Sequence, residues 1–507
     1  MVSKIWTVAF QGIDTLDVEV QVQTTYGNLP SFAIVGLADK AVGESRERIR
    51  NALHAIGLSL PAKKITVNLA PARVQKEGTH YDLPIILALL GSMGVLNREE
   101  LSQCTAVGEL ALDGSLASVP GVLPAAFQTY AQNRKLICPA QSGPEAAWIK
   151  DLEVVAAPNL LSLVNYFKGN QVLSPPEARI SIPESSGVDF REIKGQATAK
   201  RVLEIAAAGG HNVLLIGPPG AGKSMLAKRL PTILPSLEPE EALELSMIYS
   251  VAGLLPEGRL LHDRPFRDPH HSASLPALVG GGLKARPGEI SLAHRGVLFL
   301  DELPEFSRAA LESLRQPLET GQISVARANF HITYPAQVQL IAAMNPCRCG
   351  YLTDPGRSCS RVPLCGRDYQ SKISGPLLDR IDMHISMPAV APVELSSMEV
   401  GESSASIKQR VMKARKIQKE RYEVLNSEAP KKSFTNSDLS GPLLEEVATP
   451  SEEGKKLLNQ AAEKFRLSAR SYYRILKVAR TIADLEGSSS VSSSHVAEAL
   501  CYRQMEW

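Results

Sequence analysis

Hydrophobic and polar residues alternate through much of the first third of the chain. Strict alternation in Val18–Val22 and Ile65–Leu69 predicts half-buried β-strands, whereas Ala41–Ala55 shows the 3.6-residue period of an amphipathic helix. Residues 1–167 are therefore expected to form a mixed α/β domain.

Short apolar runs replace this alternation between residues 188 and 391. The runs Asn212–Ile216, Gly296–Leu300 and Val338–Ala343 are separated by helical stretches, a pattern typical of a parallel sheet that helices cover on both faces. From Ile407 onward the periodicity is almost entirely helical. The pattern predicts an α/β middle part followed by a helical end.

Two polar stretches mark the expected boundaries. Gly169–Gly187 carries a Pro-Pro pair and a Pro-Glu-Ser-Ser turn, which indicates a linker, and Val393–Ser406 separates the last apolar run from the helical end. We therefore expect an N-terminal domain at 1–170, a linker at 171–189, a middle domain at 190–392 and a C-terminal helical domain at 393–507.

The composition is that of a globular protein. Hydrophobic residues make up 44% and charged residues 21% of the 507 residues, which excludes a mostly disordered or fibrous chain. The net charge of +2 neither indicates nor excludes a nucleic-acid partner. Met1–Ala9 lacks the charged-then-apolar order of a leader, and Leu83–Leu96 is too short and glycine-interrupted to span a bilayer. We expect a soluble, cytoplasmic protein with no membrane partner.

A glycine-rich segment follows the first apolar run of the middle domain. It has the spacing G-x-x-x-x-G-K-S between a predicted strand and the predicted helix Met225–Leu230, the context in which such a loop binds a nucleotide. Backbone N–H groups and the helix dipole hold phosphates, Lys223 reaches the β- and γ-phosphates, and the Ser224 hydroxyl binds Mg²⁺. The expected ATP-binding residues are Gly217, Pro218, Pro219, Gly220, Ala221, Gly222, Lys223 and Ser224.

Polar residues end the next two apolar runs. Asp301 and Glu302 follow Val297–Leu300, so we expect Asp301 to hold Mg²⁺ and Glu302 to polarise the attacking water. Asn345 follows the run that ends at Met344, and parallel strands end at one edge of a sheet, so its amide can orient that water. An Asn-Pro pair is also an ordinary turn. The pattern predicts ATP hydrolysis with Mg²⁺.

Longer segments resemble a known family. They are Phe190–Gln196, Asp268–His271, Val279–Gly282, Pro287–His294 and Gly375–Asp382. With the P-loop, they make the chain similar to the magnesium-chelatase-like branch of AAA+ ATPases, and most specifically to the bacterial ComM (YifB) family. The resemblance implies an AAA+ P-loop ATPase core, an N-terminal Lon-protease-like α/β domain and a C-terminal helical lid domain.

The same resemblance assigns two arginines to catalysis. Arg380 corresponds to the arginine finger that reaches the γ-phosphate bound by a neighbouring subunit, which makes hydrolysis depend on ring assembly. The alternative is a surface ion pair with Asp379 or Asp382. Arg470 resembles the second sensor arginine, with Arg474 as the other candidate. A solvated or DNA-facing basic face is a further alternative for this helix.

The N-terminal domain is expected not to be a peptidase. The family's segments stand here as Gly36–Lys40 and Asn68–Ala72, and the loop equivalent to the protease nucleophile, Lys76–Asp82, contains no serine. Without a hydroxyl nucleophile beside a lysine, covalent proteolysis has no starting point. We interpret the domain as a scaffold or a DNA-binding collar.

Four of the seven cysteines gather in one 19-residue segment: Cys347, Cys349, Cys359 and Cys365. Four thiolates are the number that a closed tetrahedral Zn²⁺ site requires, and a reducing compartment favours a metal over disulfides. Only Arg348 separates the first two, which departs from the usual spacing, so free structural or redox thiols are the alternative. The position of the cluster, between Asn345 and Arg380, suggests a knuckle that braces the subunit edge.

Two insertions in the middle domain carry candidate DNA contacts. His270–Arg286 is a glycine-rich insertion, and Ile323–Tyr334 alternates like a hairpin. By resemblance to ring helicases such elements line a pore, so we expect Lys284, Arg286 and Arg327 to contact phosphates, with solvated loop charges as the alternative.

These features together predict a homohexameric, ATP-dependent DNA helicase or translocase. By family resemblance it promotes branch migration while DNA is integrated in natural transformation and recombination. The expected partners are branched, single- or double-stranded DNA and recombination proteins. The alternatives are a magnesium-chelatase-like metal-insertion or protein-remodelling ATPase and an ATP-driven protease.

Overall fold

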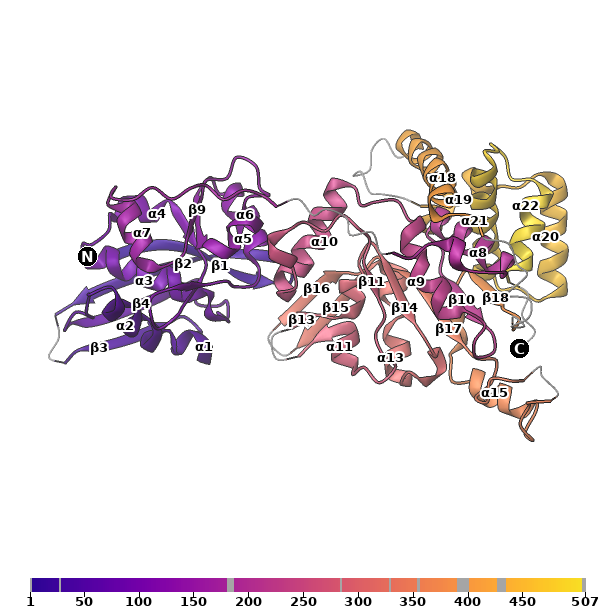
Figure 1. Cartoon of the computed structure of the whole chain (residues 1–507), viewed down its shortest axis with the longest axis horizontal. Helices are drawn as coiled ribbons and strands as arrows, with labels where there is room; N and C mark the ends of the chain where they lie inside the picture. The colour runs from indigo at the N-terminus through magenta and orange to yellow at the C-terminus, as the bar shows by residue number, and fades with distance from the viewer. Residues whose placement is uncertain are drawn as a thin grey trace.

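The computed structural model is elongated, with a seven-stranded domain at one end, a helical region at the other and a second α/β domain between them (Figure 1). It describes residues 2–26, 29–179, 187–282, 285–327, 330–352, 356–389, 401–425 and 435–503.

The N-terminal part is a mixed sheet packed against helices. Val18, Val20 and Val22 are fully buried while their neighbours are partly exposed, so the predicted alternation is confirmed. The sheet order is β3 (Ser31–Val35), β4 (Lys64–Ala70), β2 (Asp14–Thr25), β1 (Val2–Gln11), β5 (Cys104–Ala106), β8 (Lys135–Pro139) and β9 (Val154–Ala157). A separate small hairpin consists of β6 (Glu109–Leu110) and β7 (Leu116–Ala117).

The helices of this part explain its most apolar segment. Every residue of α3 (Asp82–Ser92) is buried, because this helix packs against β1 and β2 in the core. The helix predicted at 41–55 is split at Glu44, where Gly43, a weak helix former, ends the first piece. The remaining helices are α1 (Lys40–Gly43), α2 (Ser45–Ala55), α4 (Arg98–Ser102), α5 (Val122–Ala131), α6 (Gly143–Ala146) and α7 (Leu160–Phe167).

The middle part contains the predicted parallel sheet. Its order is β11 (Phe266–Arg267), β14 (Val297–Leu300), β17 (Gln339–Met344), β10 (Val213–Ile216) and β18 (Met383–Ser386), and all neighbours run parallel. The central strands are buried on both faces, which is why they read as continuous apolar runs. The helices around it are α8 (Ala197–Gly209), α9 (Lys223–Ile233), α10 (Pro239–Ala252), α13 (Arg308–Ser313), α14 (Pro317–Thr320), α15 (Leu364–Gln370) and α16 (Gly375–Leu378).

Both insertions form small hairpins on the side of the sheet that faces the N-terminal domain (Figure 1). The predicted hairpin is confirmed as β15 (Gln322–Arg327) and β16 (Phe330–Pro335). The other insertion contains α11 (Leu275–Val279), β12 (Gly280–Gly281) and the start of β13 (Arg286–Pro287), and α12 (Glu289–Leu292) follows it. Gly12, in the β1–β2 turn, lies so close to Ile332 that a Cβ at this position would be 2.8 Å from it.

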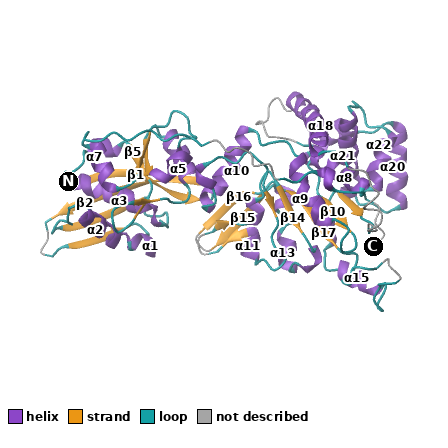
Figure 2. Ribbon diagram, viewed as in Figure 1, coloured by secondary structure: helices purple, strands orange, loops and turns teal. Residues whose placement is uncertain are grey.

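The C-terminal part is helical, as predicted for its described residues (Figure 2). Its helices are α18 (Ser404–Leu425), α19 (Gly441–Ala448), α20 (Glu452–Lys464), α21 (Ala469–Glu486) and α22 (Ser493–Cys501). They share one hydrophobic core with α8 of the middle part. Among the described residues, every helix is too short or too polar to cross a bilayer. The domain boundaries expected from the sequence stay a prediction.

Candidate nucleotide site and cysteine cluster

Four strands of the parallel sheet end at one edge and deliver the predicted polar residues there. The P-loop follows β10, Asn345 follows β17 and Asp301 follows β14. Asp268 follows β11, the edge strand. Because neighbouring parallel strands share their carboxyl edge, this topology brings Lys223 and Asn345, which are 122 residues apart, into contact.

The glycines of the P-loop have a conformational reason. Gly220 and Gly222 have φ values of 79° and 87°, in the left-handed region that favours glycine. Gly222 caps α9, whose first residue is Lys223, so the helix N-terminus and its free N–H groups point at the loop. This geometry fits a phosphate chain.

Lys223 is directed into the loop and toward the next strand. Its Nζ donates to the carbonyl oxygens of Gly217 and Pro218, at 2.7 and 3.0 Å, and to Asn345 Oδ1 at 3.0 Å. Burial lowers the pKa of Lys223, and the nearby Asp301 and Glu302 act in the opposite direction. The amide of Asn345 therefore contacts the lysine that is predicted to bind phosphates.

Hard oxygen ligands meet at the start of α9. The Ser224 hydroxyl donates to Asp301 Oδ2 at 2.6 Å, and the backbone N–H of Glu302 donates to Asp301 Oδ1 at 2.9 Å. A hydroxyl beside a carboxylate is the donor set that Mg²⁺ takes together with nucleotide phosphates, so the predicted pair fits this ion.

Glu302 has a strained backbone and an unforeseen neighbour. Its φ of 52° is unusual for a residue with a side chain, and such strain is concentrated at functional sites. His271 Nδ1 lies 3.6 Å from Glu302 Oε2. Asp268 Oδ2 lies 4.0 Å from Lys228 Nζ, and burial and the charge of Asp301 raise the pKa of Asp268, whereas Lys228 lowers it. His271 and Asp268 both belong to Asp268–His271, and the family resemblance of this segment is the signal in the sequence that points to them.

Arg380 is engaged within its own chain. It is 7% exposed and donates to the carbonyls of Arg315 and Pro376, at 3.1 and 2.8 Å, and to the exposed carboxylate of Glu319. The ion pair described for Arg380 is therefore with Glu319, and neither with Asp379 nor with Asp382 as in the alternative from the sequence.

The two sensor candidates differ in availability. Arg474 is bound to the buried carboxylate of Asp382, which also accepts the backbone N–H of Asn212 at 2.9 Å. Arg470 is exposed and close enough to lower the pKa of Glu319, the pKa of which Arg380 lowers most. Arg380 is thus paired with Glu319, whose pKa the charge of Arg470 also lowers, and Arg474 is paired with the buried Asp382.

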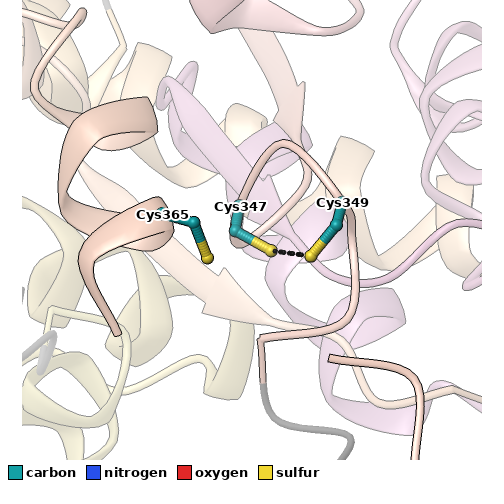
Figure 3. A group of neighbouring side chains, drawn as sticks. All are labelled: Cys347, Cys349 and Cys365. Carbon is teal, nitrogen blue, oxygen red and sulfur yellow. Dashed lines mark hydrogen bonds between the residues drawn. The ribbon is translucent and has the colours of Figure 1, made fainter. Parts of the chain in front are cut away.

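Three of the four cysteines come together (Figure 3). The sulfur atoms of Cys347, Cys349 and Cys365 all lie within 4.8 Å of one another. Sulfurs around a tetrahedral Zn²⁺ are about 3.8 Å apart, given Zn–S bonds of about 2.3 Å, so a small adjustment closes the site. Cys359 lies near enough to Cys349 and Cys365 to affect the pKa of both thiols.

The environment shifts the pKa values of two thiols of the cluster in opposite directions. Cys347 and Cys349 are joined by a hydrogen bond of 3.0 Å between sulfurs. This bond, with backbone N–H donors, lowers the pKa of Cys349 to about 6, whereas burial raises that of Cys347. A lowered pKa favours the thiolate form, which is the form that binds a soft metal ion.

The candidate DNA contacts are partly described. Arg286 is exposed at the start of β13. Lys284 and the side chain of Arg327 lie outside the described residues.

The P-loop follows β10 in the five-stranded parallel sheet, and the polar end of β17 and the acidic end of β14 lie at the same edge. This arrangement defines a P-loop ATPase domain of AAA+ type. The family models that match are "Magnesium chelatase, subunit ChlI" at residues 189–395, "Subunit ChlI of Mg-chelatase" at 18–142 and "Magnesium chelatase, subunit ChlI C-terminal" at 401–503.

Relatives match over the whole length. The YifB protein of Escherichia coli is 42% identical over 505 residues, 99% of this chain and 97% of the relative. The competence protein ComM of Haemophilus influenzae is 42% identical over 510 residues, with the same coverage. The magnesium-chelatase 38 kDa subunit of Rhodobacter capsulatus is 29% identical over 174 residues, 31% of this chain and half of the relative. The chain belongs to the ComM/YifB family of magnesium-chelatase-like AAA+ proteins.

Proposed function

We propose that the protein is a hexameric ring ATPase that acts as a DNA helicase or translocase and promotes branch migration during DNA integration in natural transformation and recombination. The observation that carries the motor part is the nucleotide edge, where two hydrogen bonds join the P-loop and α9 to the ends of β14 and β17. The name of the Haemophilus relative, a competence protein, supports the physiological part.

Hydrolysis in this proposal follows from the residues at the edge. Lys223 holds the β- and γ-phosphates, Ser224 and Asp301 hold Mg²⁺, and Glu302 takes a proton from the attacking water while Asn345 orients it. Release of Lys223 from Asn345 on binding of a phosphate frees the amide for that water. Each step changes the contacts that these residues make with the γ-phosphate. The ends of the strands therefore take different positions with ATP and with ADP bound.

The arginines couple neighbouring subunits. Arg380 of one subunit leaves the carboxylate of Glu319 and binds the γ-phosphate of the ATP in the neighbouring subunit. Arg470 binds the same phosphate. The high exposure of Glu319, whose side chain is 57% accessible, supports this exchange. A guanidinium added to the developing negative charge raises the rate by about 10³ to 10⁵.

DNA is expected to contact the two hairpins. They lie side by side between the sheet and the N-terminal domain, and Arg286 is exposed on one of them (Figure 1). We propose that Arg286, Lys284 and Arg327 bind DNA phosphates.

Two further proposals concern the metal and the partners. We propose that the four cysteines bind Zn²⁺, and that the protein works with recombination proteins in the cytoplasm.

ATP turnover with and without DNA tests this proposal. Turnover is measured without nucleic acid, with single-stranded DNA and with a four-way junction. Stimulation by DNA is the expected result. Turnover that is indifferent to DNA would favour the second candidate, a chelatase-like metal-insertion or remodelling ATPase, which the family models and the Rhodobacter relative support.

A protease is disfavoured by the contacts of the N-terminal loop. The Lys76 amine is buried and donates to the carbonyl of Pro71, while the Thr79 hydroxyl donates to Glu109. The hydroxyl and the amine are thus engaged with different partners, whereas a Ser-Lys type of nucleophile needs them together.

A further inference from the structure

The cysteine cluster is built into the ATP site rather than set apart from it. Cys347 is two residues after Asn345, which accepts the hydrogen bond from Lys223. The cluster therefore begins where the nucleotide-sensing strand ends. The sequence predicts a knuckle at the subunit edge but gives no sign that the cluster adjoins the ATP site of its own chain.

The turn that carries the first two cysteines packs directly on the P-loop. The backbone N–H of Gly350 donates to the carbonyl of Cys347 at 3.0 Å and closes the turn. A Cβ on Gly350 would lie 2.6 Å from Cδ of Pro219, and the φ of Gly350 is +85°. Only glycine allows the turn to lie this close to the ring of the P-loop proline.

The helix that carries Cys365 reaches a third catalytic segment. On α15, Gln370 Nε2 donates to the carbonyl of Pro346 at 2.9 Å. Burial raises the pKa of Tyr369, on the same helix, and the nearby charges of Glu305 and Glu302 raise it further. Just beyond the helix, Lys372 Nζ lies 3.5 Å from Glu305 Oε1. Glu305 is three residues after Glu302, in the turn that follows the acidic strand. The turn and α15 thus contact the P-loop, the sensor strand and the acidic turn.

We propose that the metal in the cysteine cluster braces the ATP site: by joining the turn 347–350 to α15, a thiophilic divalent ion, Zn²⁺, holds Pro219 and Asn345 where the nucleotide requires them. The proposal rests on the ATP and Zn²⁺ sites proposed above. Without the ion, the free energy that metal binding contributes to local folding is lost, and the turn is no longer joined to α15 through the metal. Nucleotide affinity then falls, although no cysteine touches the nucleotide.

Zinc content and binding of fluorescent mant-ATP, measured in parallel on the full-length protein, test the brace. Wild type is expected to hold about one Zn²⁺ per chain. Cys349→Ser should lose the metal and bind mant-ATP at least about tenfold more weakly. Cys501→Ser, which changes an exposed cysteine on α22, is the matched control and should change neither quantity.

Gly350→Ala separates the brace from a general loss of folding. This variant keeps all four cysteines and should keep the metal, yet weaken mant-ATP binding several-fold, because its Cβ displaces Pro219. Treatment of wild type with ortho-phenanthroline should also weaken binding, whereas its non-chelating meta isomer should not. These two measurements apply even where Cys349→Ser does not fold.

Different results would contradict the brace, the zinc assignment and the proposed ATPase. A metal-free Cys349→Ser or a metal-loaded Gly350→Ala with wild-type mant-ATP affinity overturns the brace. Wild type with less than about half an equivalent of zinc, purified without chelators, overturns it together with the zinc assignment. Wild type that does not bind mant-ATP overturns the proposed ATPase itself.

Discussion

Glu302 combines strain, exposure and position in one residue. Its left-handed backbone conformation costs about 1 kcal/mol or more, and the structure at the end of the strand must offset this cost. We predict that Glu302→Gln still binds mant-ATP but lowers turnover by a factor on the order of 10² to 10⁴, because a general base is removed. Glu257→Gln is the matched control, since Glu257 is an exposed acid with a φ of 47°. Turnover by Glu302→Gln close to wild type would remove Glu302 from catalysis.

Buried histidines make the fold sensitive to acid. Burial lowers the pKa of His80 from 6.5 to about 4, and its Nε2 contacts the carbonyl of Val8 at 2.9 Å. An unfolded histidine binds protons below pH 6.5, and the folded one does not until about pH 4, so stability is present above this window and falls as the pH falls through it. We predict a loss of about 3 kcal/mol by pH 4.

His80→Gln tests this prediction because it keeps an N–H donor and does not titrate. Urea unfolding followed by tryptophan fluorescence, to which Trp6 in β1 contributes, should depend less on pH in the variant than in wild type. Equal pH dependence in the two proteins would assign the acid sensitivity to other groups.

At the scale of elements, DNA binding by the basic hairpin insertion can be measured through the dependence of affinity on salt concentration. Each phosphate contact that is lost should reduce the slope of log affinity against log salt by about 0.9 on duplex DNA. Arg286→Ala is therefore expected to flatten this slope by about one contact. Lys455→Ala removes an exposed charge on the distant α20 and serves as the control. An unchanged slope for Arg286→Ala would take this residue off the DNA path.

Helices and strands that depend only on the nearby pattern of apolar and polar residues could be predicted from the sequence. The strand before the P-loop, the acidic strand and the β15–β16 hairpin follow from apolar runs and alternation, and all are confirmed. Contacts between distant segments could not be predicted. Arg380 and Glu319 are 61 residues apart, and their pairing depends on how α14 and α16 pack.

The same limit applies to the second histidine of the family segment and to the cysteine turn. The sequence indicates neither the approach of His271 to Glu302 nor that of Gly350 to Pro219, since no periodicity encodes which loop ends meet at a sheet edge. The family resemblance supplied the roles proposed for Arg380 and Arg470, and these stay predictions.

At the scale of the whole molecule, the N-terminal domain is fixed to the ATPase domain. Ser250, on α10, donates to the buried carboxylate of Glu145, and Trp148 Nε1 donates to the carbonyl of Gly258 at 3.0 Å. Burial raises the pKa of Glu145, and the bond from Ser250 opposes this shift. The N-terminal domain is therefore positioned to move with α10 and to stay beside the two hairpins.

Ring assembly gives a prediction about mixtures of inactive chains. Arg380→Ala should bind ATP and lose turnover by about 10³ or more, and Lys223→Ala should bind ATP poorly. In rings assembled from both at equal amounts, about a quarter of the interfaces join an intact P-loop to an intact Arg380, so turnover should reappear. Mixtures that stay as inactive as their components would show that Arg380 acts within its own chain.

The central claim is that ATP hydrolysis moves branched DNA, and strand displacement from a labelled four-way junction tests it most directly. With ATP and Mg²⁺, the wild-type protein should convert the junction into its two duplex products, and Glu302→Gln should bind the junction without converting it. Junctions that stay intact while ATP is hydrolysed at full rate would contradict the claim and identify the protein as a remodelling ATPase with a different substrate.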